Sequence, residues 1–325
     1  MKINKIIIWG HPLHSHTHSY IHNGFFIAFK ELGYDTHWFH DNMNIDSSFD
    51  FSNSLFITEH QVDNKIPKRN DCLYFVHFLE KHKYPGVNDS NLIDLKCSFR
   101  DMKREKENKE NDPNLLFTPI TDKKIEFYSN INNQLTYFIL WATDLLPRQI
   151  MDNINNISTI RNNRTNNIFF IGQLTNSWNQ LKQLCQCNNI PFVKYGATFN
   201  NKDPRALSIE DNQKFIQQSF ISPALQDELQ IKDDYVPCRI FKNISYGRMG
   251  ITNNPFVYNL FDKKILFDSN INNLFEKSIN FEKNYDSNSN DTVISNMKYV
   301  MDNHTYIQRI ESLKLFINTN TIFNI

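Results

Sequence analysis

The sequence predicts an α/β protein made of two Rossmann-like domains that face each other across a cleft. Short apolar runs typical of buried strands alternate with helix-length amphipathic segments in both halves of the chain. A polar stretch over residues 152–167 separates the two halves, and isoleucines are its only apolar residues. The length of 325 residues suits two domains of roughly 150 residues each. We therefore expect an N-terminal domain over residues 1–155 and a C-terminal domain over residues 165–325.

The first predicted unit is a strand, a helix and a second strand. Residues 5–9 form a short β-branched run, and residues 34–39 resume as a strand. Between them, Ser19 can cap a helix over residues 20–32, and Gly33 is well placed to end it. The apolar residues of this helix recur at three- and four-residue steps, so one stripe faces a sheet. Such a βαβ unit predicts a parallel sheet.

Two further buried strands are predicted over residues 54–58 and 72–76. The first ends at Glu59 and His60, and the second ends at His77. In open parallel sheets ligands gather outside the carboxyl ends of the strands. We therefore expect these polar residues to share one crevice with the histidine-rich loop that follows the first strand.

The remaining elements are predicted from the same patterns. Residues 100–112 are highly charged and indicate a solvated loop or an exposed helix, whereas residues 135–147 are densely apolar. The second half restarts the alternation, with residues 220–225 as a strand or a short helix. Its other predicted strands cover residues 167–172, 191–195 and 264–267, and its predicted helices cover residues 178–187, 209–218, 236–246 and 254–261.

Composition excludes several classes of protein. The chain has 35 Lys and Arg residues and 35 Asp and Glu residues. Its net charge therefore creates no positive potential that would attract nucleic acid or an acidic membrane, and we expect neither as a partner. The apolar run near the N-terminus is too short for a signal peptide or a transmembrane segment. The five cysteines are odd in number and mostly lie in apolar segments, which predicts reduced thiols and a cytoplasmic protein. No glycine-rich nucleotide motif of the GxGxxG or P-loop type occurs.

The segment YVPCRIFKNISYGRMGITNNPFVYNLF, residues 235–261, resembles the donor site of GT-B glycosyltransferases. Pro237, Arg239, Phe241 and Gly247 follow the P-x-R-x-F-E-x-x-x-x-G pattern of family-1-like bacterial and viral members. The resemblance implies a metal-independent hexosyltransferase without a cofactor, which uses a nucleoside-diphosphate sugar. It also implies a glycan, a lipid-linked oligosaccharide or another hydroxyl compound as acceptor, and a closing segment that packs back on the first domain. For a viral member, the cytoplasm would be that of the host cell.

The chemistry of this segment supports an anion site. Arg239 and Lys242 lie three residues apart and share one helix face, where two cations can hold a diphosphate whose charge grows as the sugar departs. The loop after Gly247 leads into a helix whose free N–H groups offer a second phosphate cradle. Alternatively, Arg239 and Lys242 only form the solvent-exposed face of an amphipathic helix and bind no ligand. The predicted donor and phosphate residues are Arg239, Lys242, Ser245, Gly247, Thr252, Asn253 and Asn254.

One residue departs from the GT-B pattern. Lys242 stands where many members have a glutamate that holds the donor ribose, which puts the ribose contact and a retaining mechanism in doubt. The ends of the first two strands of the second half offer other contacts for the nucleoside. These are Gly172, Gln173, Tyr195 and Gly196, although Tyr195 suits a packing role equally well.

The stretch HPLHSHTHSY, residues 11–20, is the candidate catalytic loop. An apolar strand, a loop with GH and a helix ending in LGY resemble the start of GT-B N-terminal domains, where in several inverting members a histidine of this loop is the general base. Histidine can take the proton of an attacking hydroxyl at neutral pH. We rank His16 first, His18 second and His11 third, with a structural role as the alternative for each.

Two other functions fit part of the sequence. Alternating histidines up to His18 resemble the HxH opening of PHP-type metal phosphoesterases, which need further His and Asp ligands from later strands. Beyond His82 the sequence offers only His304, so we expect no metal. A nucleotide-sugar binder without turnover is the third hypothesis, and Lys242 is compatible with it. Slow release of nucleotide without acceptor distinguishes a transferase from a binder.

Overall fold

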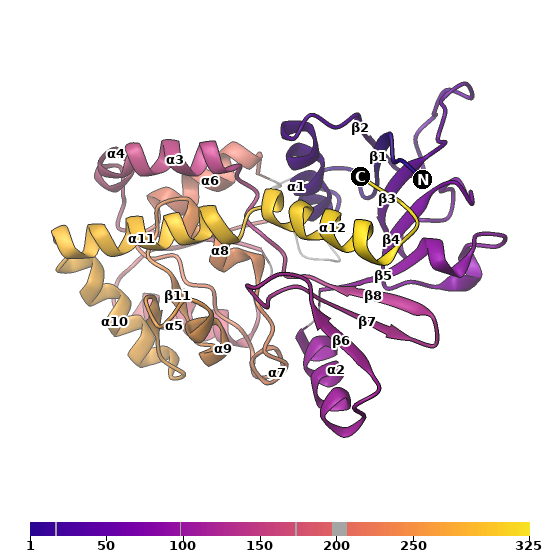
Figure 1. Cartoon of the computed structure of the whole chain (residues 1–325). Coiled ribbons are helices and arrows are strands. Elements are labelled where there is room, and N and C mark those ends of the chain that lie inside the picture. Colours follow the sequence, from indigo (N-terminus) through magenta and orange to yellow (C-terminus); the bar gives the residue numbers. More distant parts are fainter. Residues whose placement is uncertain (17, 98, 173, 197–206) are drawn as a thin grey trace. The chain divides into compact units, whose positions relative to one another are not determined.

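The computed structural model describes residues 1–16, 18–97, 99–172, 174–196 and 207–325. The chain forms two compact units (Figure 1): unit 1 comprises Met1–Asp144 with Tyr306–Ile325, and unit 2 comprises Leu145–Thr305. The sequence placed the division between residues 155 and 165. In the structure unit 2 begins earlier, at Leu145, and it includes the helices α3 (Pro147–Asn155) and α4 (Ile157–Asn162).

Unit 1 is built on an eight-stranded mixed sheet with the order β2-β1-β3-β4-β5-β8-β7-β6. All neighbours from β2 to β8 are parallel, whereas β7 and β6 continue the sheet antiparallel. Because β1, β3 and β4 are almost wholly buried, they appear in the sequence as continuous apolar runs. The strands are β1 (Lys5–Trp9), β2 (Thr36–Phe39), β3 (Ser54–Glu59), β4 (Leu73–His77), β5 (Leu92–Lys96), β6 (Leu116–Pro119), β7 (Phe127–Ile131) and β8 (Gln134–Phe138).

The helices α1 (His18–Glu31) and α12 (Tyr306–Asn320) lie side by side in unit 1 (Figure 1). The ring of Tyr306 packs on Phe25 with centroids 4.8 Å apart. Further along α12, Phe316 contacts the sheet residues Phe75 and Tyr137, at 5.9 and 5.1 Å between ring centroids. The last helix of the chain therefore completes the core of unit 1. The charged segment predicted as a loop or helix forms α2 (Phe99–Asn111), and short 3-10 helices cover Lys81–Lys83 and Asp89–Asn91.

Arg309 on α12 is fully buried and forms an ion pair with Glu126, which is also buried, at 2.9 Å. The same guanidinium donates to the backbone carbonyls of Leu140 at 2.7 Å and Trp141 at 3.4 Å. Burying a charge is costly unless it is paired and hydrogen-bonded. These contacts therefore fix α12 to the backbone that follows β8.

Unit 2 contains two parallel strand pairs, β9 with β10 and β11 with β12. The segment predicted as a strand or helix over residues 220–225 is neither. The N–H of Phe220 donates to the carbonyl of Asn167, just before β9, and the N–H of Ala224 donates to the carbonyl of Ile251 in β11. The strands are β9 (Ile168–Ile171), β10 (Phe192–Tyr195), β11 (Ile251–Thr252) and β12 (Leu266–Phe267). The helices besides α3 and α4 are α5 (Asn176–Cys187), α6 (Ile209–Gln218), α7 (Glu228–Lys232), α8 (Cys238–Ser245), α9 (Pro255–Leu260), α10 (Ile271–Lys283) and α11 (Ser287–Asn303).

Three arginines of unit 2 share one buried carboxylate. Glu282 on α10 pairs with Arg161 at 2.9 Å, with Arg248 at 3.2 Å and also with Arg164. The guanidinium of Arg161 additionally stacks over the ring of Tyr285 at 3.2 Å. One carboxylate thus joins α4, the end of α10 and the chain that leads into β11. In the described part of the chain, no helix is long and apolar enough to cross a bilayer.

Candidate functional site

The histidine-rich loop runs from the end of β1 to the start of α1. Gly10 lies beside the ring of His22, and a Cβ at this position would clash with the ring nitrogen Nδ1. His14 adopts a positive φ of 69°, and its N–H donates to the hydroxyl of Ser19 at 3.1 Å. The predicted cap Ser19 therefore lies within the first turn of α1, which begins at His18, and holds the loop instead.

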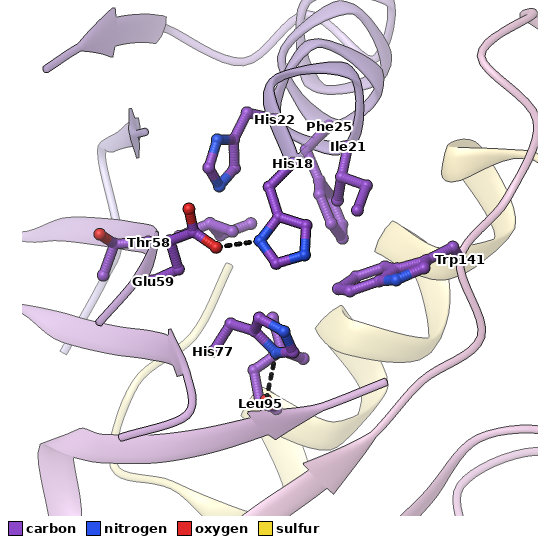
Figure 2. Close-up of a pocket in the computed structure, with 10 residues that line it drawn as sticks. His18, Ile21, His22, Phe25, Thr58, Glu59, His77, Leu95 and Trp141 are labelled. Atoms are coloured by element: carbon purple, nitrogen blue, oxygen red, sulfur yellow. Dashed lines mark hydrogen bonds and ion pairs between the residues drawn. The ribbon is translucent and has the colours of Figure 1, made fainter. Parts of the chain in front are cut away.

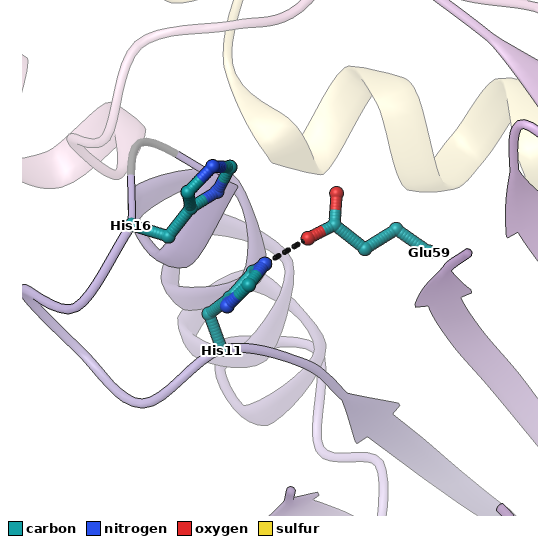
Figure 3. Close-up of side chains that lie close together, drawn as sticks. All are labelled: His11, His16 and Glu59. Carbon is teal, nitrogen blue, oxygen red and sulfur yellow. Dashed lines mark ion pairs between the residues drawn. The ribbon is translucent and has the colours of Figure 1, made fainter. Parts of the chain in front are cut away.

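Glu59 lies at the centre of the histidine cluster. It ends β3, and its carboxylate is fully buried. One carboxylate oxygen, Oε1, contacts Nε2 of His11, and the other, Oε2, contacts Nδ1 of His18 (Figures 2 and 3). The ring of His16 stacks on that of His11 with centroids 4.2 Å apart. The three histidines ranked from the sequence are thus brought together around one carboxylate.

His77 joins this cluster from the neighbouring strand. It ends β4 opposite Glu59 in the parallel register, and its ring lies 5.0 Å from that of His18. The Nδ1–H of His77 donates to the carbonyl of Leu95 at 3.0 Å, so Nε2 is the unprotonated nitrogen. His60, expected in the same crevice, packs on Phe78 at 5.6 Å instead.

A small cavity opens inside the cluster (Figure 2). His18, His22, Glu59 and His77 supply its polar walls. Trp141 closes one side, with its ring 5.6 Å from that of His77. Thr58 and apolar side chains from α1, β3 and β5 supply the rest. The cavity therefore lies at the carboxyl ends of parallel strands, where ligands of α/β sheets bind.

Burial decides the charge state of several groups in the cluster. Burial lowers the pKa of His22 to about 3 and that of His77 to about 4, so both imidazoles are neutral at physiological pH. The pKa of His16 is also lowered, first by burial and then by the nearby His11 and His18. Burial alone would raise the pKa of Glu59, but hydrogen bonds from the same two histidines outweigh it and hold this pKa well below its usual range.

The contact with Glu59 gives His18 the arrangement of a general base. A carboxylate that accepts the Nδ1 proton fixes the tautomer in which Nε2 can accept a proton, and it stabilises the imidazolium that then forms. His18 also lines the cavity, whereas His16 stacks on His11. Sequence reasoning placed Glu59 near the loop but did not assign it to a particular histidine. The strand register that pairs them is visible only in the structure.

In unit 2, the structure brings Arg239 and two of the predicted glycines together. Gly172 and Gly196 have φ values of 139° and 89°, and their backbones touch, because a Cβ on Gly196 would lie 2.9 Å from the nitrogen of Gly172. Arg239 donates to the carbonyl of Ile171 at 2.9 Å. This contact places its guanidinium beside Gly172, where an added Cβ would be 3.1 Å from Nη2. The guanidinium of Arg239 and the backbones of two glycines thus lie together at the carboxyl ends of β9 and β10.

Three other residues were predicted to contact the nucleoside or the phosphates. Gln173 lies outside the described residues. Tyr195 stacks on Phe215 at 4.6 Å, which is the packing role considered as its alternative. Lys242 is half-buried on α8, one turn after Arg239.

Ser245 and Gly247 end helix α8. The hydroxyl of Ser245 donates to the carbonyl of Lys242 at 2.9 Å, and Gly247 adopts a φ of 89° against Ile157. Both residues are buried at the opposite end of α8 from Arg239. The phosphate role predicted for them is therefore replaced by helix termination.

The second phosphate cradle predicted at Thr252, Asn253 and Asn254 is filled by the protein itself. Asn254 accepts the N–H of Phe256 at 2.8 Å as the cap of α9, and the first residue of that helix is a proline, which has no N–H. Asn253 bonds both backbone groups of Gln226, at 2.9 and 2.8 Å. The hydroxyl of Thr252 accepts the N–H of Asn254 at 3.1 Å. All three side chains are buried and hold loops together.

The two α/β units have the GT-B fold that the sequence predicted. The sequence itself matches no protein-family profile and no curated protein. A solved alpha-glucosyltransferase in complex with UDP and a 13-mer DNA containing a central A:G mismatch is similar, with a TM-score of 0.54 and 10% identity over 95% of this chain and 98% of that chain.

Two further solved structures have the same fold. An alpha-glucosyltransferase with UDP and DNA containing a HMU base has a TM-score of 0.50 and 10% identity over 96% of this chain and 98% of that chain. An alpha-glucosyltransferase (AGT) with UDP has a TM-score of 0.50 and 11% identity over 95% and 98%. Because two of the three structures contain DNA, they give no support to the prediction that nucleic acid is excluded as a partner.

Proposed function

We propose that this protein is a glycosyltransferase that moves a sugar from a nucleoside-diphosphate sugar to a hydroxyl group of an acceptor. The observation that carries the proposal is the likeness in fold to alpha-glucosyltransferase structures, which extends over nearly the whole of both chains. Those structures contain UDP, so a UDP-sugar is the first donor to test. The reaction needs a base for the acceptor hydroxyl and a positive charge near the leaving diphosphate. Unit 1 offers a histidine that contacts a carboxylate, and unit 2 offers an arginine beside two glycines.

Unit 2 supplies the proposed donor site. Gly172 and Gly196 carry no side chains, so a diphosphate can approach their backbone closely. Arg239 and Lys242 then offset the negative charge that grows on the leaving diphosphate. Arg239 keeps its position through its bond to the carbonyl of Ile171 and through Phe170, over whose ring the guanidinium lies at 4.8 Å.

Unit 1 supplies the proposed base. Nε2 of His18 takes the proton of the acceptor hydroxyl while the oxygen forms its bond to the anomeric carbon. The bond between that carbon and the diphosphate oxygen breaks in the same step, and the electron pair leaves with the nucleotide. Glu59 stabilises the resulting imidazolium through its contact with Nδ1.

The acceptor is the least constrained part of the proposal. The family resemblance favours a glycan or a lipid-linked oligosaccharide. Two of the similar structures contain DNA, so DNA belongs among the acceptors tested. The experiment therefore pairs UDP-, GDP- and dTDP-sugars with acceptors of all three kinds and measures released nucleotide and labelled product.

We expect one nucleotide sugar to raise the melting temperature and to be hydrolysed slowly without acceptor. Arg239→Ala should abolish both effects, whereas Arg100→Ala, a matched change on the exposed surface of α2, should leave them intact. If no nucleotide sugar binds, the proposal is wrong. Binding without hydrolysis or transfer would favour the binder without turnover.

A further inference from the structure

His11, His16 and Glu59 form a second arrangement within the histidine cluster (Figure 3). Each offers one ligand atom, a ring nitrogen or a carboxylate oxygen, and these atoms all lie within 4.8 Å of one another. Oε1 of Glu59 faces His11, while Oε2 of the same carboxylate faces His18. The proposed base His18 therefore contacts Oε2 of Glu59, while Oε1 remains available for a shared site with His11 and His16.

Two imidazole nitrogens and one carboxylate oxygen are a donor set typical of transition metals. Zinc and iron(II) are both bound by two histidines and one carboxylate when a coordination position is kept open. Bonds of about 2.0–2.2 Å around a single ion bring such donors to roughly 3.3 Å from one another. Small side-chain rotations would bring the three atoms to this spacing.

The surroundings of Glu59 favour a bound cation. Its carboxylate is completely buried, and a buried carboxylate is costly unless a positive charge compensates it. None of the described residues that line the adjoining cavity is a lysine or an arginine, and its polar lining besides Glu59 consists of His18, His22, His77, Thr58 and the indole of Trp141. Two imidazole nitrogens beside a buried carboxylate are a donor set that a divalent transition metal can use.

We propose that His11, His16 and Glu59 bind one divalent transition-metal ion, with zinc as the first candidate. His18 then orients the ligating carboxylate through Oε2, as hydrogen-bonded partners of metal ligands commonly do. From the sequence we expected no metal, because the alternating histidines resemble a metal motif but no further His or Asp ligands follow from later strands. The structure supplies the third ligand from β3. This inference does not depend on the proposed sugar transfer, because metal binding can be measured without any nucleotide sugar.

The test is direct binding to protein that has been freed of metal with a chelator. Zinc is measured by equilibrium dialysis with elemental analysis, and cobalt(II) by its visible absorption. We expect one ion per chain, and we expect His11→Ala and Glu59→Gln each to weaken binding by at least about 100-fold. His82→Ala, which removes a histidine whose side chain is 79% exposed, should bind as the wild type does.

A ligand substitution separates coordination from a structural role. His16→Cys replaces one zinc ligand with another, so it should retain zinc and give cobalt the intense absorption of a thiolate complex, whereas His16→Ala should lose both metals. Circular dichroism checks that each variant is folded. The proposal is overturned if the wild type binds less than one ion per chain at micromolar zinc, or if folded His11→Ala binds as tightly as the wild type.

Discussion

Replacing Arg309 with methionine should destabilise unit 1 strongly. The change removes the guanidinium that pairs with the buried Glu126 and also satisfies the carbonyl of Leu140. Removing one partner of a buried ion pair costs about 3–5 kcal/mol, because the other charge remains buried without compensation. The carbonyl adds about 1–3 kcal/mol. We therefore expect a loss of about 4–8 kcal/mol in the free energy of unfolding.

The assay is urea denaturation combined with hydrogen exchange resolved by peptide, which shows whether unit 1 opens first. Arg100→Met is the matched control on an exposed helix and should change stability by less than about 0.5 kcal/mol. The double variant Arg309→Met with Glu126→Leu should recover a large part of the loss, because it leaves no unpaired charge. A loss below about 1 kcal/mol in the single variant, or no recovery in the double variant, would refute this reasoning.

Four further predictions follow from the described contacts. Burial lowers the pKa of His22 to about 3, so between about pH 7.5 and 5 this histidine takes up a proton only in the unfolded chain. The free energy of unfolding should therefore fall by about 2 kcal/mol as the pH drops over this range. His22→Gln should remove this part of the pH dependence when unfolding of the metal-free protein is measured at several pH values. Glu282→Gln leaves three arginines without their carboxylate and should cost about 3–5 kcal/mol, with faster hydrogen exchange in unit 2, whereas the exposed Glu276→Gln should not. Arg239→Lys keeps the positive charge but loses the planar guanidinium that can donate two parallel hydrogen bonds to a phosphate. Calorimetry should therefore show that the donor binds about tenfold more weakly. His18→Ala should lower kcat of transfer by about 10²–10⁴ while the donor KM stays nearly unchanged.

The elements that the sequence predicted well are those with a continuous apolar run or a strong helical stripe. Strands β1, β3 and β4 are buried on both faces, and α6 has the predicted bounds. The strand pair β6 and β7 escaped prediction because its residues are partly exposed at the edge of the sheet and show no clear alternation. The polar stretch over residues 152–167, predicted to separate the two domains, instead contains the end of α3 and all of α4. Its isoleucines fall three residues apart, and Ile157 and Ile160 form the buried side of α4, while Ile154 is partly buried on α3.

The site could be predicted only in part. The carboxyl ends of parallel strands predicted that Glu59, His77 and the histidine loop would converge, and the structure brings them together. The contact between His18 and Glu59 spans 41 residues and depends on the register of β1 against β3, which no local pattern encodes. In the donor segment, asparagines that suit a phosphate cradle equally suit caps and loop bonds. Asn253 and Asn254 serve the second purpose.

The return of the chain into unit 1 has a consequence for how the protein is made. Lys2 and Asn324 form a β-bridge, and Phe316 completes the packing against Phe75 and Tyr137. During synthesis, every residue of unit 2 leaves the ribosome before α12 does. Unit 2 can therefore fold while translation continues, whereas unit 1 keeps an apolar face uncovered until α12 emerges, and this interval is when the nascent chain is most exposed to aggregation and to chaperones.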